Sequence, residues 1–183
     1  MTLSFSTHIN GQPTHFVSKI WNSLYNEGFD DYHYSIYQMM WLEKFGTGGI
    51  DDDLRNKRNP KIHTIRADKS NRWKPGNKIH FVIKNRTPDR FQFAPVLTVK
   101  SVQKIDIVWS QKFDGNTGTV IVLIDEKEFG IITIWKQEIN NLNNLQGLEE
   151  LAVNDGFDSV KDFLDYFNDD FSGKIIHWTD HRY

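Results

Sequence analysis

The spacing of apolar residues changes near residue 61, and this change is what most constrains the fold. Before it, apolar side chains recur every three or four residues, as on one face of a helix, and after it they alternate. The helical spacing predicts one helix over residues 14–27 and a second that starts at Asp30 or Asp31 and ends near Gly46. Glycines and aspartates at 46–53 then indicate a linker.

The alternating part of the chain predicts several short strands, with two short helices inserted before the last strand. The strand candidates are 62–66, 78–85, 92–109 (one long or bent strand, or two), 118–125, 130–136 and 174–178, and the helix candidates are about 145–154 and 158–168. Asp114-Gly-Asn marks a hairpin turn. Residues 1–13 look irregular. This order predicts an α+β fold built on a small mixed β-barrel that the terminal strand completes.

Composition narrows the class of protein. A chain of 183 residues with 14% aromatic residues can bury a core as one domain. Because the chain has no cysteine, disulfides, thiolate metal sites and cysteine nucleophiles are excluded. No apolar run approaches the roughly 20 residues that span a bilayer, and no leader-like segment opens the chain. We therefore expect a soluble, cytoplasmic protein with no membrane partner.

Positive charge is concentrated in one part of the chain. Residues 54–104 hold 14 of the 22 Lys and Arg residues but only two of the 24 acidic residues, Asp68 and Asp89. A cationic face beside an acidic remainder is typical of proteins that bind polyanions such as RNA. The alternative is that basic strands and acidic helices neutralise each other in the fold.

The run 61–66 places several polar residues on one short strand. In a strand, Thr64 and Arg66 share a face, and His63 lies on the opposite one. Lys61 follows Pro60, so it can precede the strand proper and lean toward the threonine. Arg66 is then placed to bind an oxyanion or phosphate, or to pair with an acidic residue.

A second cationic group follows that strand. Trp73 lies between two cations in a predicted loop, where it would stack on a base, or alternatively pack under the barrel. The candidate nucleic-acid contacts are Arg66, Arg72, Trp73, Lys74 and Lys78. His177 and His181 have the i, i+4 spacing at which two histidines on a helix can bind a metal ion, but this segment is predicted to be a strand followed by a tail. The sequence predicts neither a metal nor a cofactor.

Five motifs occur in an order that resembles the ASCH domain, a PUA-like β-barrel family associated with RNA. They are an apolar helix, Lys-x-x-Thr-x-Arg, Lys-Pro-Gly-Asn, Asp-Gly-Phe and a short final strand, here Lys61, Thr64, Arg66, Lys74-Pro75-Gly76-Asn77, Asp155-Gly156-Phe157 and Ile175-Ile176-His177-Trp178. The resemblance covers about residues 61–179 and implies a PUA-like barrel with flanking short helices. The helix at 14–27 matches the family's first helix. A helical insertion at about 28–57 separates that helix from the barrel, within a single domain over 1–183.

The resemblance also implies a chemistry. Some small family members are hydrolases, namely an amidohydrolase acting on acetylated cytidine and a reported ribonuclease. The residues assigned to that amidohydrolase match Lys61, Thr64 and Asp155, where the aspartate replaces a glutamate that is one methylene longer. A buried lysine with a lowered pKa could activate the threonine hydroxyl, while the carboxylate orients the lysine. The alternatives are a solvated lysine, a threonine in ordinary strand packing and a turn aspartate.

Two classes of function follow. The first is an RNA- or nucleotide-binding module that uses a basic cleft, which the sequence favours. The second is a small amidohydrolase or ribonuclease acting on an acylated cytidine or on RNA through the Lys61, Thr64 and Asp155 site. A protein-interaction factor of a mobile element or phage is a third interpretation. The sequence slightly favours a monomer and identifies no physiological ligand.

Overall fold

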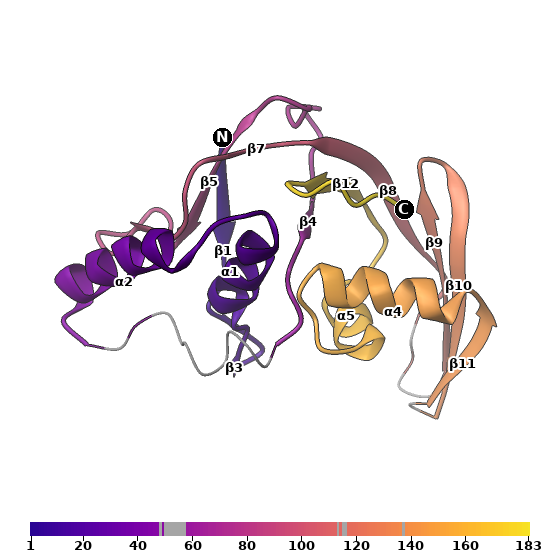
Figure 1. Ribbon diagram of the computed structural model, residues 1–183. Helices are drawn as coiled ribbons and strands as arrows, with labels where there is room; N and C mark the ends of the chain where they lie inside the picture. The colour runs from indigo at the N-terminus through magenta and orange to yellow at the C-terminus, as the bar shows by residue number, and fades with distance from the viewer. Residues whose placement is uncertain (48, 50–57, 113, 115–116, 137) are drawn as a thin grey trace.

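The computed structural model describes residues 1–47, 49, 58–112, 114, 117–136 and 138–183. These residues form an α+β fold in which four helices accompany three sheets (Figure 1). The predicted α+β class is therefore confirmed. In the described part of the chain, no helix is long and apolar enough to cross a membrane.

The larger sheet has six strands, in the spatial order β11, β10, β9, β8, β12 and β4. Their bounds are β4 (His63–Arg66), β8 (Ser101–Gln111), β9 (Thr117–Ile124), β10 (Lys127–Trp135), β11 (Glu138–Asn143) and β12 (Phe171–His177). The last strand, β12, pairs antiparallel with both β4 and β8. The prediction that residues 62–66 and the final strand share one sheet is thus confirmed.

The second sheet has four strands, β1 (Thr2–Phe5), β5 (Lys78–Ile83), β6 (Phe91–Gln92) and β7 (Leu97–Thr98). β1 runs parallel to β5, with Leu3 and Phe5 buried. The third sheet is the short hairpin of β2 (His8–Ile9) and β3 (Gln12–Pro13). The expectation that residues 1–13 are irregular is therefore wrong, because β1 is ordered by its pairing with β5, far away in the sequence.

The predicted barrel is not closed. At one side the chain passes from β7 into β8, where Val99 N donates to Asn77 O and Lys100 N donates to His177 O. At the other side the edge strands β1 and β4 are joined by a side chain, as Arg66 Nη2 donates to Ser4 O at 2.8 Å. No backbone ladder joins β1 to β4 among the described residues. The two sheets therefore meet at this seam without closing into a barrel.

Two helices cover each large sheet. α1 (Phe16–Asn26) and α2 (Asp31–Phe45) pack with the four-stranded sheet, whereas α4 (Leu145–Asn154) and α5 (Val160–Tyr166) pack against the six-stranded one. In Figure 1, α2 lies at one end of the molecule, and α4 and α5 lie below β8 and β12, with β10 beside α4. All four helices agree closely with the predicted ranges.

Three predictions fall wholly or partly outside the described residues. α2 lies within the predicted insertion at 28–57, but residues 48 and 50–57 are outside the described residues, as is most of the linker at 46–53. The predicted hairpin turn joins β8 to β9, and Thr117 N donates to Asp114 Oδ1 at 2.8 Å. Its residues 115 and 116 are also outside the described residues.

Candidate functional site: a buried lysine–aspartate pair and a basic cavity

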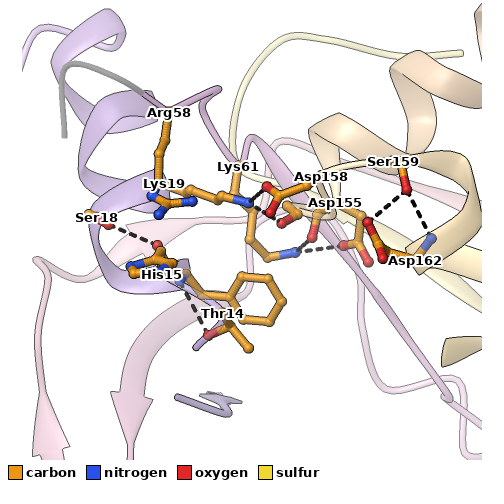
Figure 2. Close-up of polar contacts among 12 residues, drawn as sticks. Thr14, His15, Ser18, Lys19, Arg58, Lys61, Asp155, Asp158, Ser159 and Asp162 are labelled. Carbon is orange, nitrogen blue, oxygen red and sulfur yellow. Dashed lines mark hydrogen bonds and ion pairs between the residues drawn. The ribbon is translucent and has the colours of Figure 1, made fainter. Parts of the chain in front are cut away.

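A buried ion pair joins the start of β4 to the end of α4. Lys61 Nζ donates to Asp155 Oδ1 at 2.7 Å and also to the Asp155 carbonyl oxygen (Figure 2). The carboxylate accepts a further hydrogen bond from Ile65 N at 3.0 Å. Lys61 is 1% exposed and Asp155 is 4% exposed. The pair therefore lies in the protein interior, where the charge of each side chain is partly compensated by the charge of the other.

Burial and the charge of the partner act in opposite directions on the pKa of each member of this pair. Burial lowers the pKa of Lys61 to about 8, an effect that Asp155 partly offsets and that the charges of Arg66 and Lys19 reinforce. Burial acts in the opposite sense on Asp155, but the charge of Lys61 and the contact with His63 hold the pKa of that carboxyl below its usual value. The Lys61 amine also lies 4.8 Å from the centre of the Phe16 ring.

A second buried lysine binds the same turn. Lys19 on α1 donates to Gly156 O and to Asp158 Oδ1, both at 2.6 Å (Figure 2). Lys19 and Lys61 thus each bind one backbone carbonyl and one carboxylate of the segment 155–158. Gly156 has a φ of +93°, and a Cβ there would lie 2.9 Å from both Lys61 Cδ and Phe16 Cε1. The two lysines fix this turn, and only glycine fits at its centre.

A cavity of about 420 Å³ adjoins this turn. It is lined by residues of the β2–β3 hairpin, the start of α1, the turn 156–158 and α5, together with Arg58: Ile9, Asn10, Gln12, Pro13, Thr14, His15, Phe16, Lys19, Arg58, Gly156, Phe157, Asp158, Asp162 and Asp165. Phe16 and Gly156 both line the cavity and contact Lys61, which itself does not line it. Phe16 and Gly156 therefore lie between the Lys61 amine and the cavity.

Thr64 lies outside this contact. It is 2% exposed and pairs with Ile176 of β12, on the face of β4 opposite to His63. His63 lies on the side of Asp155, with its Nδ1 3.7 Å from Asp155 Oδ1. Of the three residues proposed for catalysis, the structure brings Lys61 and Asp155 into direct contact, and among the described residues no hydrogen bond joins Thr64 to either of them.

His63 lies between the Lys61–Asp155 pair and Tyr183. Its Nε2 lies 2.8 Å from Tyr183 Oη, which accepts a hydrogen bond from Asn154 Nδ2 at 2.9 Å. The His63 ring also lies 5.3 Å from the ring of His177. Burial lowers the pKa of both histidines. Sequence reasoning missed Lys19 and Tyr183, because neither belongs to a motif and both act on residues distant in the sequence.

A second cavity, of about 470 Å³, lies along the seam between β1 and β4. It is lined by Met1, Thr2, Leu3, Ser4, Arg66, Ala67, Arg72, Trp73, Asn85 and Arg86, so that its described lining includes three arginines and no acidic residue. Arg66 comes from β4, Arg72 from the following loop and Arg86 from the loop after β5. We call this the basic cavity.

The predicted nucleic-acid contacts divide between the basic cavity and the surface. Arg66, Arg72 and Trp73 line the cavity, whereas Lys74 and Lys78 are exposed outside it. Lys78 Nζ donates to Thr98 Oγ1 at 2.9 Å. Trp73 is 5% exposed and belongs to the core of the four-stranded sheet, as the packing alternative expected. Arg86 was not singled out from the sequence.

The loop that presents Arg72 is ordered by a carboxylate. Asp68 Oδ1 accepts from Arg72 N at 3.0 Å and Oδ2 accepts from Trp73 N at 2.9 Å. Lys174 Nζ lies 3.3 Å from the same carboxylate. Asp68, one of the two acidic residues in the cationic segment 54–104, therefore holds this loop in its conformation.

No protein-family model, curated protein or solved structure matches this chain. The resemblance to the ASCH domain therefore rests on the motifs alone. Among the described residues, no three His, Asp or Glu side chains are placed to hold a metal ion.

Proposed function

We propose that this protein binds RNA or a nucleotide, and that Arg66, Arg72 and Arg86 hold the phosphate groups in the basic cavity. The observation that carries this proposal is the convergence of three arginines from separate segments on a cavity in whose described lining no residue is acidic. Arginine presents a planar set of donors that matches phosphate oxygens in pairs, which makes it the preferred residue for such contacts.

The contacts and the exposure of these three arginines support the proposal. Arg66 already donates to Ser4 O and lies 5.2 Å from the Phe5 ring, so its position is fixed. Arg72 and Arg86 are exposed, and their side chains form no hydrogen bond or ion pair with the described residues. Their donors are therefore available to a ligand. Lys74 and Lys78 extend the positive surface beside the cavity and would attract a longer polyanion.

The test is a binding titration with a fluorescently labelled single-stranded RNA. The double variant Arg72→Glu/Arg86→Glu should weaken binding at least about tenfold, and similarly for different RNA sequences, because phosphate contacts do not read bases. Lys127→Glu is the matched control, since Lys127 is exposed on β10 and far along the chain from the cavity. Unchanged affinity in the double variant would rule out this surface.

We also propose that the fold is an open form of the PUA-like barrel of ASCH domains. Its support is the order of the five motifs, together with the passage of β7 into β8 at one side and the approach of β1 to β4 at the other. In this arrangement the basic cavity occupies the seam at which a closed barrel would have a backbone ladder.

Hydrolysis at the Lys61–Asp155 pair is a second candidate, favoured by one observation. An amine with a pKa near 8 is partly neutral at physiological pH and can accept a proton from a nucleophile. Since the amine lies behind Phe16 and Gly156, turnover requires that Phe16 moves aside. This requirement, and the absence among the described residues of a hydrogen bond from Thr64 to Lys61 or Asp155, make hydrolysis the second candidate after binding.

Hydrolysis is tested with a panel of acylated cytidines and RNA. Lys61→Met should abolish turnover, and Asp155→Glu, which restores the longer carboxylate of the family, should maintain or raise the rate. A wild-type protein that is inactive on the whole panel would end this candidate and leave the binding proposal intact.

A further inference from the structure

Helix α2 is apolar on both of its sides. On the inner side, Tyr34 is buried against Trp21 at a ring distance of 5.2 Å, and Trp41 packs on Phe91 at 5.5 Å. On the outer side, large apolar residues face solvent. A surface helix is normally polar opposite its buried face, and one that is apolar all round is normally covered on both sides. The outer side of α2 therefore has the apolar composition of a covered surface, although its large apolar residues are exposed.

The exposed apolar residues of the described chain are concentrated on this helix. Nine large hydrophobic side chains are exposed, and five of them belong to α2: Tyr32, Ile36, Met39, Met40 and Leu42. Tyr32 is 70% exposed and Met39 is 69% exposed. Clustered exposure of this kind marks an interaction surface, whereas single exposed apolar residues are ordinary. Figure 1 shows α2 at one end of the molecule.

The order of residues along the outer side is self-complementary. Tyr32, Ile36, Met39 and Glu43 follow the spacing i, i+4, i+7 and i+11, which forms one row along the helix. When two copies of this row are placed side by side in antiparallel orientation, Ile36 lies opposite Met39, and Tyr32 lies opposite Glu43. In a two-fold antiparallel pair, each apolar residue thus meets an apolar residue, and each phenol hydroxyl meets a carboxylate that can accept its hydrogen bond.

We propose that two copies of this chain associate through antiparallel α2 helices, with Ile36 of each copy packed against Met39 of the other. The polar residues of the row agree with this choice of occupant. Tyr32 and Glu43 give each end of the row a polar partner from the other copy, whereas the end charges stay within their own chain, because Asp31 accepts from Tyr25 Oη and Lys44 donates to Pro88 O at 3.3 Å. The antiparallel arrangement also sets the two helix dipoles in their favourable orientation. The interaction goes beyond ligand binding and uses none of the basic-cavity residues.

Sedimentation velocity over a range of protein concentrations tests the proposal. The wild-type protein should shift from one chain mass to twice that mass as concentration rises. Ile36→Glu/Met39→Glu should remain at one chain mass, because it places like charges across the axis twice. Both positions are exposed and glutamate is a good helix former, so the variant should keep the wild-type unfolding midpoint.

A charge exchange distinguishes this geometry from other contacts. Ile36→Glu/Met39→Lys should restore the double mass at low salt, because the two-fold axis then pairs unlike charges. Val108→Thr is the matched control, since Val108 is as exposed on β8 as Ile36 is on α2, and it should associate like the wild type. A wild-type protein of one chain mass at every concentration, or association that survives in Ile36→Glu/Met39→Glu, would overturn the proposal.

Discussion

The Lys61 amine and the Asp155 carboxylate lie 2.7 Å apart in the interior, although 94 residues separate them in sequence. Each is nearly inaccessible to water, so each depends on the other for compensation of its charge. Buried ion pairs of this kind contribute little net stability against an apolar pair, but the loss of one partner leaves a bare buried charge. The contact thus fixes the relative positions of β4 and the turn after α4.

Asp155→Asn should destabilise the fold by about 3–5 kcal/mol, because it leaves the Lys61 charge unpaired in the interior. The double variant Lys61→Met/Asp155→Leu removes both charges and should lose clearly less. Urea denaturation monitored by tryptophan fluorescence measures both free energies of unfolding. Equal losses in the single and double variants would contradict the view that the unpaired charge is the source of the cost.

Gly156→Ala tests the packing of the turn against Lys61. Gly156 and Gly28 have φ values of +93° and +91°, so alanine at either position carries a similar backbone strain of about 1–2 kcal/mol. A Cβ at Gly28 has no neighbour within 4 Å, whereas one at Gly156 meets Lys61 and Phe16. Gly156→Ala should therefore cost about 1–3 kcal/mol more than Gly28→Ala in the same unfolding measurement. Similar losses would show that the turn can relax away from Lys61.

Stability should fall as the pH is lowered from about 6.5, the usual pKa of an unfolded histidine. Burial, and then the nearby His63, His181 and Arg182, lower the pKa of His177 to about 3 in the folded protein. Between these two values the unfolded chain binds a proton that the folded chain does not. Each such histidine therefore removes up to about 1.4 kcal/mol per pH unit. The free energy of unfolding measured from pH 7.5 to pH 4.5 checks this slope.

The same experiment has an internal control. His177→Leu should flatten the pH dependence, and at pH 7 it should cost little, because both ring nitrogens of His177 lack a hydrogen-bond partner among the described residues. His8→Gln, at an exposed histidine, should leave the slope unchanged. A steep slope retained in His177→Leu would assign the effect to other groups.

How much of this fold was predictable depends on how local each signal is. The four helices follow from apolar spacing within single segments, and Asp30 and Ser159 cap α2 and α5 with their own side chains. β1 has only two inward residues, and β11, with the sequence Glu-Ile-Asn-Asn-Leu-Asn, lacks a clear alternation. Both strands depend on a partner strand that no local pattern reveals.

The candidate sites divide in the same way. The contact between Lys61 and Asp155 was anticipated only through the order of motifs, whereas the position of Thr64 on the face of β4 opposite to His63 follows from strand alternation, which the sequence also indicated. The cationic segment 54–104 predicted a basic surface and contains all three cavity arginines, of which Arg66 and Arg72 were named as candidate contacts. The third arginine, Arg86, is brought to the cavity by the loop after β5, with a left-handed φ of 65° that the sequence did not indicate.

The salt dependence of RNA binding is the most direct test of the proposed function. Each arginine–phosphate contact with a single strand should contribute about −0.7 to the slope of log affinity against log salt, so three contacts predict a slope of about −2. Arg72→Glu/Arg86→Glu should make this slope clearly shallower, while Lys127→Glu leaves it unchanged. An affinity insensitive to salt, or a slope that the double variant does not alter, would contradict phosphate binding in the basic cavity.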